Sequence, residues 1–307
     1  MDDSDRTASL MTPAKLAQVQ PRGQASPAAW LDQMAADAGH AHVRRLGELR
    51  IDMQTQASQR DISPLVAELT RLGKELPTLD FGLLAQRGWW AKVTGQGRSA
   101  GAQFSHQFEE IDEAVRALAS QAQALQRKNL EAASSADRTA MEVEVEYRAI
   151  DRILDQGTRW LQDMRSQLKI RQAASPDAAA QQQISADTAR CETLVERLKD
   201  LRAVTNAAQQ AHQHAKDLAA RRFTLLQTLQ QALTADVKEW RTQLSRVASA
   251  AAAQGAAASS QDSPAETHRE LQLCIKQLLS DCAQLQAGEK ALGESLGALG
   301  MQLDVVG

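Results

Sequence analysis

A heptad pattern of apolar residues over residues 104–171 constrains the fold of this chain more than any other feature. Apolar or small residues recur there at alternating steps of four and three, a spacing that places them along one side of a helix. We call this series the seam. Its members are Phe104, Phe108, Ile111, Val115, Leu118, Ala122, Leu125, Ala132, Ala136, Thr139, Val143, Tyr147, Ile150, Leu154, Gly157, Leu161, Met164 and Leu168. The seam predicts a helix that packs along its length against partner helices.

The seam passes Ser134-Ser135 without losing phase. A hairpin at these serines has no reason to preserve register, so we expect one helix from about residue 100 to 173, about 110 Å long at 1.5 Å per residue. Asn129 falls on the seam itself. A polar residue at one core position tends to fix register or partner number. Exposure near a local gap is the alternative for Asn129.

The composition favours helices over sheets. Aromatic residues make up 3% of the chain, and Ala, Gln, Leu and Arg dominate it. Alanine and straight-chain residues lose little freedom in a helix, whereas the β-branched and aromatic residues that suit strands are scarce. We therefore predict an all-α fold, an elongated antiparallel bundle of long coiled-coil-like helices.

Proline, glycine and serine suggest the organisation along the chain. Serine followed by proline starts a helix at Ser26-Pro27 and again at Ser63-Pro64. Ser175-Pro176-Asp177 supplies a reversal after the long helix. The predicted parts are a disordered lead over 1–25, short helices and a Gly/Trp-rich connector over 26–101, a long antiparallel helical hairpin over 102–254, a linker over 255–264, and a C-terminal helix over 265–307 that packs on the bundle.

Two places in the returning helix are predicted to be irregular. Residues Gln209 to Gln213 are nearly all polar or alanine, so we expect the weakest packing there. Thr234 resembles a helix cap and precedes a new apolar stripe that includes Trp240. We therefore expect a new helix start near Thr234.

Charge and targeting signals favour a cytoplasmic protein. The net charge of −3 argues against nucleic-acid binding through the overall field. No apolar run approaches the roughly 20 residues that span a bilayer, and the acidic start Met1-Asp2-Asp3 lacks the apolar core of a signal peptide. The three cysteines, an odd number, fit a reducing compartment.

Several motifs that can carry chemistry are better explained as structure. Gly95, Gly97 and Gly101 resemble a phosphate cradle, but no strand precedes them, so we interpret them as a flexible joint before a helix. The histidine pairs lie two residues apart and point to different sides of a helix, which is unsuited to chelation. We interpret these histidines, two arginine pairs and one group of glutamates as solvated or charged helix surface. They are His40/His42, His212/His214, Arg44-Arg45, Arg221-Arg222 and Glu142/Glu144/Glu146.

The cysteines are predicted to be structural. Cys274 and Cys282 lie about 12 Å apart on a helix, so they cannot bridge each other. Cys282 falls on an apolar stripe, so we expect it to be buried; a thiol that reacts with an oxidising anion is the alternative. No nucleophile, acid pair or ligand set stands out. We therefore expect no enzyme activity, no cofactor and no metal.

Trp89-Trp90, flanked by Arg87 and Lys92, is the best candidate contact surface. Tryptophan beside cations suits a membrane interface or a partner groove. The alternative is that both rings fold onto the bundle as a cap.

Three further segments carry a resemblance to a known family. The first is Met11-Thr12-Pro13-Ala14-Lys15-Leu16, the second runs from Phe104 through Phe108-Glu109-Glu110-Ile111-Asp112 to Asn129-Leu130, and the third is Lys238-Glu239-Trp240-Arg241-Thr242-Gln243-Leu244. Together they resemble the TelA/KlaA-like toxic anion resistance family, which is associated with tellurite resistance in bacteria. The resemblance covers most of residues 60–250. Ala235-Asp236-Val237 stands where the family often has a proline, which indicates a diverged member.

The resemblance implies a non-enzymatic stress-response protein that acts through protein-protein contacts or self-association along its helical faces, without binding the tellurite oxyanion itself. It brings no catalytic residues. The alternative is a cytosolic coiled-coil scaffold that makes a peripheral contact with the inner membrane through the Trp-containing segment.

Overall fold

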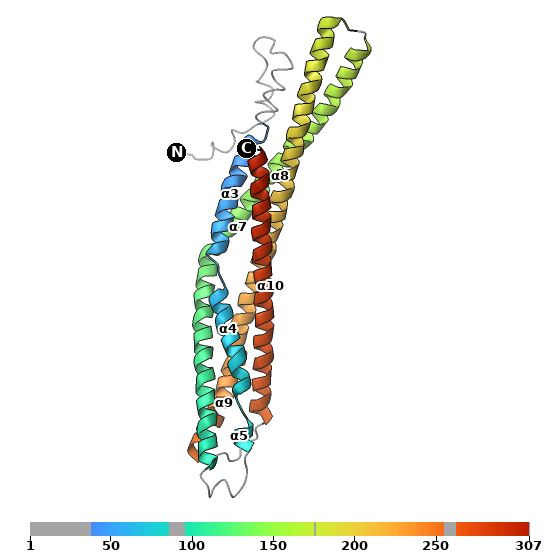
Figure 1. The fold of residues 1–307 in the computed structure, drawn as a ribbon. Coiled ribbons are helices and arrows are strands. Elements are labelled where there is room, and N and C mark those ends of the chain that lie inside the picture. The colour runs from blue at the N-terminus through green and yellow to red at the C-terminus, as the bar shows by residue number, and fades with distance from the viewer. Residues whose placement is uncertain (1–37, 86–95, 175, 255–261, 307) are drawn as a thin grey trace, which may run out of the picture. The chain divides into compact units, whose positions relative to one another are not determined.

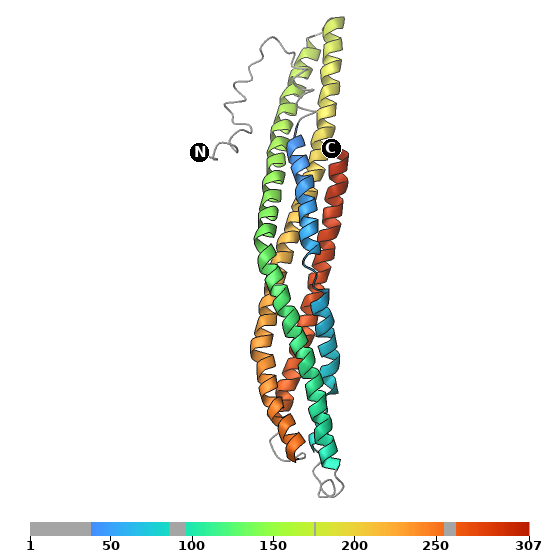
Figure 2. The same ribbon diagram turned by 90° about the vertical axis from the view of Figure 1, so that its left-hand side faces the viewer.

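The computed structural model describes residues 38–85, 96–174, 176–254 and 262–306. Helices make up nearly all of these ranges, which contain no strand. The long helices pack against one another as a bundle (Figures 1 and 2). The predicted all-α fold is confirmed. Within the same ranges, no helix combines the length and the apolar character that a membrane crossing requires.

The described elements follow one another in a simple order. They are α3 (His40–Ser58), α4 (Ser63–Glu75), a short 3₁₀ turn η2 (Leu76–Thr78), α5 (Gly82–Ala85), α7 (Gln96–Ala173), α8 (Ala178–Gln231), a π-helical segment η3 (Ala232–Asp236), α9 (Val237–Gln254) and α10 (Asp262–Val306).

Helix α7 contains the whole seam and continues through Ser134-Ser135, as predicted. Every seam residue is buried except Phe108, Ala132 and Ala136, which are half-buried, as is Asn129 at the seam position between Leu125 and Ala132. The hydroxyl of Ser135 donates back to the carbonyl of Ala132 (3.0 Å), so this serine is satisfied inside the helix.

The residues divide into two compact units. Unit 1 comprises Met1–Arg45, Glu146–Asn206 and Gln302–Gly307, and unit 2 comprises Leu46–Val145 and Ala207–Met301. In unit 1 the end of α7 and the start of α8 run antiparallel, because Arg171 pairs with Asp187 at 2.9 Å.

In unit 2 the helices form an antiparallel bundle. Helix α7 runs against α8 and α9, since His212 reaches Ala140 and Arg241 reaches Asp112. Helix α10 runs against the same two helices, because Arg222 pairs with Glu289 and Trp240 with His268. Helix α4 lies beside α10 (Figures 1 and 2), where a side chain at Gly73 would meet Ile275 and Leu279.

Aspartates bind near two helix starts. The N-cap of α4 is Ile62, so the predicted serine cap is wrong, and Asp61 accepts hydrogen bonds from the backbone N–H (2.9 Å) and hydroxyl of Ser63 in the first turn. Asp177 accepts from the backbone N–H of Ala180 (2.8 Å) at the start of α8.

The first helix differs from its prediction. Gly39 has φ = 75°, a left-handed conformation that residues inside a helix do not adopt, so α3 begins at His40, directly after it. The predicted start at Pro27 lies outside the described residues. Within α3, Leu49 and Met53 are buried, whereas the apolar Ile51 between them is exposed.

The predicted helix start at Thr234 is also wrong, because α8, η3 and α9 follow one another without a break. The Thr234 hydroxyl donates to the carbonyl of Gln230 (2.8 Å) rather than capping a new helix. Buried positions change from steps of three and four to a step of five between Ala232 and Val237. The π-helical segment absorbs the one extra residue and brings Trp240 into the core.

Candidate functional site

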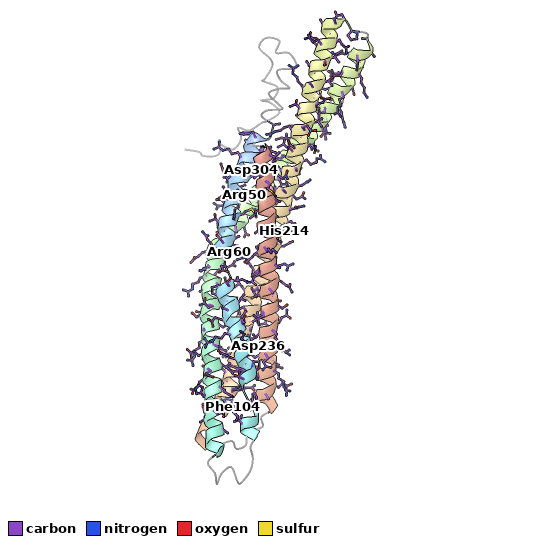
Figure 3. The ribbon with its side chains drawn as sticks, in the orientation of Figure 1. Arg50, Arg60, Phe104, His214, Asp236 and Asp304 are labelled. Carbon is purple, nitrogen blue, oxygen red and sulfur yellow. The ribbon has the colours of Figure 1, made fainter. Side chains whose placement is uncertain are left out.

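Two family-like segments that are far apart in the sequence meet in unit 2. The ring of Phe108 on α7 lies 5.3 Å from that of Trp240 on α9, measured between centroids. One turn further along α7, Oδ2 of Asp112 accepts from Nη2 of Arg241 at 3.0 Å, and the two residues form an ion pair. Phe104, labelled in Figure 3, is fully buried one turn before Phe108. We call Phe81, Phe104, Phe108, Trp240 and His268 the aromatic cluster.

A chain of hydrogen bonds runs from Trp240 through His268 to the backbone of Leu76. The indole Nε1–H of Trp240 can only donate, so Nδ1 of His268, at 3.1 Å, accepts. The proton on Nε2 of His268 is then donated to the carbonyl of Leu76, at 2.9 Å. Burial lowers the pKa of His268, although its bond to Leu76 acts in the opposite direction. His268 is therefore neutral, with both ring nitrogens bound, and holds α9, α10 and η2 together.

Asp112 is the charged residue beside the cluster. Its side chain is almost wholly buried, yet it accepts hydrogen bonds from both Arg241 and the exposed Arg116. The two guanidinium groups compensate the cost of burying the carboxylate. The sequence places Asp112 and Trp240 in family-like segments but does not show that they share one site.

The part of the glycine-rich segment that the structure describes is helical, so it is not the flexible joint that we predicted. Gly97 and Gly101 lie inside α7, and Gly95 lies outside the described residues. A Cβ atom on Gly101 would lie 2.2 Å from the backbone carbonyl oxygen of Ala251. This position therefore requires glycine because α7 and α9 approach each other closely there.

Two of the histidines predicted to lie on a solvated surface are engaged with other helices. His212 is buried; its Nδ1–H donates to the carbonyl of Ala140 (3.0 Å), and its Nε2 lies 3.7 Å from Glu144. His42 bonds Glu146 at 2.6 Å. The predicted solvated surface is therefore wrong for His212, whereas His42, Glu144 and Glu146 are half-buried.

The packing near His212 differs from one residue to the next. Ala208 and Ala211 are fully buried, because an alanine-rich helix can approach its neighbours closely. His212 itself lines a pocket in unit 2.

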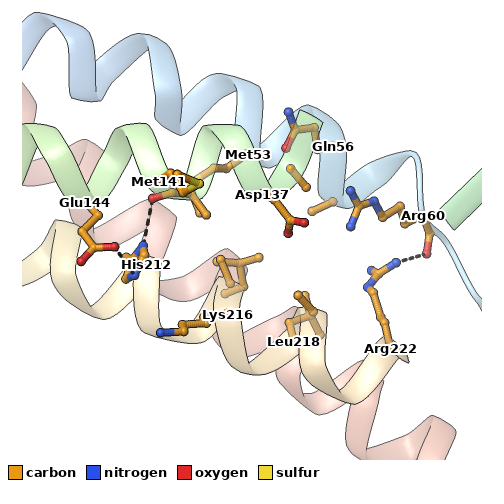
Figure 4. Close-up of a pocket in the computed structure, with 16 residues that line it drawn as sticks. Met53, Gln56, Arg60, Asp137, Met141, Glu144, His212, Lys216, Leu218 and Arg222 are labelled. Carbon is orange, nitrogen blue, oxygen red and sulfur yellow. Dashed lines mark hydrogen bonds and ion pairs between the residues drawn. The ribbon is translucent and has the colours of Figure 1, made fainter. Parts of the chain in front are cut away.

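The pocket has a volume of about 410 Å³ and lies among α3, α7, α8 and α10 (Figure 4). Arg60 and Arg222 line one end, and His212 and Glu144 line the other (Figure 4). Arg222 was predicted to be solvated, but it is 5% exposed. It donates to the carbonyl of Arg60 (3.0 Å) and pairs with Glu289. The prediction of a surface pair at Arg221-Arg222 is wrong for Arg222.

All three cysteines are free thiols, and Cys191 and Cys282 are buried. The prediction that Cys282 packs on the apolar stripe is confirmed. Burial raises the pKa of both Cys274 and Cys282 to about 11, and contacts with Asp236 contribute for Cys274. Burial also raises the pKa of Cys191. Because a thiolate is the reactive form, these thiols are poor nucleophiles at neutral pH.

The structure describes only some of the other predicted site residues. Trp240 is completely buried, and Asn129 is half-buried in α7. Arg87, Trp89, Trp90 and Lys92 lie outside the described residues, so membrane docking through them stays a prediction. Within the described ranges, no three His, Cys, Asp or Glu side chains gather in a group that can hold a metal.

Sequence reasoning missed Arg60, Glu289 and His268. A signal existed for His268, because it lies on the apolar stripe of α10 between Pro264 and Leu271, at steps of four and three. Arg60 follows α3 in a turn, where nothing in the sequence distinguishes it. Comparisons with models of protein families, with curated proteins and with solved structures gave no match.

Proposed function

We propose that this protein is a cytoplasmic, non-enzymatic stress-response protein of the TelA/KlaA-like kind, which acts through protein contacts along its helical faces. The observation that carries the proposal is the meeting of two family-like segments, through Phe108 with Trp240 and Asp112 with Arg241. Segments that resemble a family because they build the same core should touch in the fold, whereas chance matches have no reason to do so.

The state of the family-like residues supports a structural rather than a catalytic role for them. Trp240 is fully buried, and its N–H is bound to His268. Asp112 is held by two arginines. A catalytic side chain has to contact its substrate. Trp240 and Asp112 are instead bound to side chains of the protein and hold helices together.

An exposed row of apolar side chains on α7 supports action through contacts. Leu130, Met141 and Val145 are 70%, 65% and 64% exposed. At 100° per residue they lie within about 60° of one another around the helix. We call these three residues the contact stripe. Met141 and Val145 lie one turn apart, and Leu130 lies on the same side of α7 about 16 Å away along the helix axis. Exposed apolar side chains that gather on one side of a helix mark interaction sites more often than scattered single ones do.

A complementation experiment tests the proposal. Deletion of the gene should raise sensitivity to tellurite or to an envelope stress, and the wild-type protein should restore resistance. The double variant Leu130→Ser/Val145→Ser should fold, as circular dichroism will show, but should not restore resistance. Leu273→Ser, at a comparably exposed apolar position on α10 (65% exposed), is the matched control.

Unchanged sensitivity of the deletion strain across a panel of both stresses would contradict the proposed stress response. Full rescue by the double variant would instead contradict the role of the contact stripe. Met141 is left unchanged in this experiment because it also lines the pocket of unit 2.

A further inference from the structure

The pocket of unit 2 has the size and walls of a small-molecule site. Its volume of about 410 Å³ lies within the range of about 300–1,000 Å³ that is usual for ligand pockets. Apolar side chains form most of its surface. They include Met53, Ala57, Ala140, Met141, Ala215 and Leu218.

One end of this pocket holds two buried guanidinium groups. Arg60 and Arg222 are 8% and 5% exposed. Arg60 donates from Nη2 to the carbonyl of Ala132 (2.5 Å), but its buried Nε–H has no hydrogen-bond partner. A buried donor without an acceptor is unfavourable, so this group gains from any acceptor that reaches it.

The two guanidinium groups differ in their partners. Glu289 pairs directly with Arg222. Burial lowers the pKa of both arginines, and the charge of Arg60 lowers that of Arg222 further. Burial also raises the pKa of Glu289, although Arg222 opposes this. Among the described residues, no carboxylate forms an ion pair with Arg60, and the charge of Asp137 acts on it without direct contact.

We propose that this pocket binds a small organic anion, a monocarboxylate with a short hydrocarbon body, whose carboxylate pairs with Arg60 and whose body lies along the apolar walls of α7 and α8. A planar guanidinium matches a carboxylate in shape and supplies parallel donors. The inference rests on the pocket alone and is independent of the proposed stress response.

The other charged groups of the pocket decide between ligand classes. Asp137 lines the pocket, and its charge acts on Arg60, raising the pKa of that group. Glu144 lies at the opposite end beside His212, and the exposed Lys216 lines the wall between them. A cationic ligand with the same hydrocarbon body would be repelled by the two buried guanidinium groups. It could bind only with its charge away from that end of the pocket. Asp137 opposes an incoming carboxylate, so its removal should strengthen binding.

The test is isothermal titration calorimetry of the full chain with acetate, butyrate, hexanoate and octanoate at constant ionic strength. Affinity should rise along the series by about fourfold for each methylene that becomes buried, until the pocket is full. Hexylamine carries the same body with the opposite charge and should bind at least about tenfold more weakly than hexanoate. Inorganic phosphate tests whether charge alone suffices and should bind more weakly than hexanoate.

Variants assign the binding to this pocket. Arg60→Gln should weaken hexanoate binding by about tenfold or more, the loss expected when a charge-assisted hydrogen bond is removed. Met141→Glu places a negative charge at an exposed position on the pocket wall and should weaken binding at least as much. Met301→Glu is its matched control, because Met301 is equally exposed in unit 2 but does not line the pocket. Asp137→Asn should tighten binding severalfold.

Circular dichroism melts of each variant establish that it folds. If Arg60→Gln does not fold, Met141→Glu and Asp137→Asn, both at exposed positions, carry the test. The proposal is overturned if no carboxylate of the series binds, if hexylamine or phosphate binds as tightly as hexanoate, or if Met141→Glu binds hexanoate like the wild type.

Discussion

The indole N–H of Trp240 on α9 donates to Nδ1 of His268 on α10 at 3.1 Å, which fixes the proton of this histidine on Nε2. Protonation of His268 would place a second N–H against that of the indole and break the bond. The charged form is therefore disfavoured twice, by burial and by its partner.

This bond makes folding stability depend on pH. The pKa of His268 is lowered in the folded state, so the unfolded chain binds more protons in the window between that lowered value and the ordinary value of about 6.5. Stability from this group is fully present above about pH 6.5 and is lost as the pH falls through the window. Urea unfolding over a pH series should show this decline.

The matched variant for that measurement is His268→Gln. A glutamine amide can accept from Trp240 and donate to Leu76, but it does not titrate. Its unfolding free energy should decline less in acid than that of the wild type, since the other histidines are common to both proteins. Identical slopes in the two proteins would exclude His268 as the source.

A methyl group at Gly101 should destabilise the fold. The added Cβ would lie 2.2 Å from the backbone oxygen of Ala251, so one of the two helices has to move. We expect Gly101→Ala to lower the free energy of unfolding by about 1–3 kcal/mol, the usual cost of overpacking.

Gly293→Ala is the control for that change, because nothing lies within 4 Å of its added Cβ. It removes backbone freedom from the unfolded chain at an open helical position and should stabilise the protein by about 0.5–1 kcal/mol. Opposite signs in chemical denaturation are the expected result. Stabilisation by both substitutions would show that α7 and α9 are not in close contact at Ala251.

The carboxylate of Asp112 should matter more than either arginine that binds it. Asp112→Asn keeps the shape but loses the charge that both guanidinium groups share, and should cost about 1–3 kcal/mol. Arg116→Ala should cost less than about 1 kcal/mol, because Arg116 is 67% exposed. Thermal melts of both variants and of Arg241→Ala would measure this. Equal losses for Asp112→Asn and Arg116→Ala would contradict it.

The thiols should react slowly in the folded protein. With the pKa of Cys274 and Cys282 raised to about 11, few thiolates exist at neutral pH. Iodoacetamide should modify the native protein slowly, with a rate that rises into the alkaline range, and should modify the urea-unfolded protein quickly. Mass spectrometry assigns each site. Rapid modification of a native thiol at neutral pH would revive the hypothesis that a thiol reacts with an oxidising anion.

The sequence was enough to predict the helical fold and the buried face of its longest helix. The seam predicted both the course of α7 through Ser134-Ser135 and the burial of its members from Phe104 to Leu168. This succeeded because a heptad spacing is a local property: the angle per residue fixes which side chains share a face, whatever the partner is.

Which polar residues lie inside the bundle became clear from the contacts between helices. The sequence indicates that Arg222 and His212 are surface residues, because a charged or polar side chain on a helix is usually solvated. Both can be buried because a carbonyl or carboxylate on another helix binds them. The need for glycine at position 101 and the pairing of Trp240 with His268 likewise depend on how closely two helices approach. Such distances are set by the packing of the bundle, and no spacing within one helix encodes them.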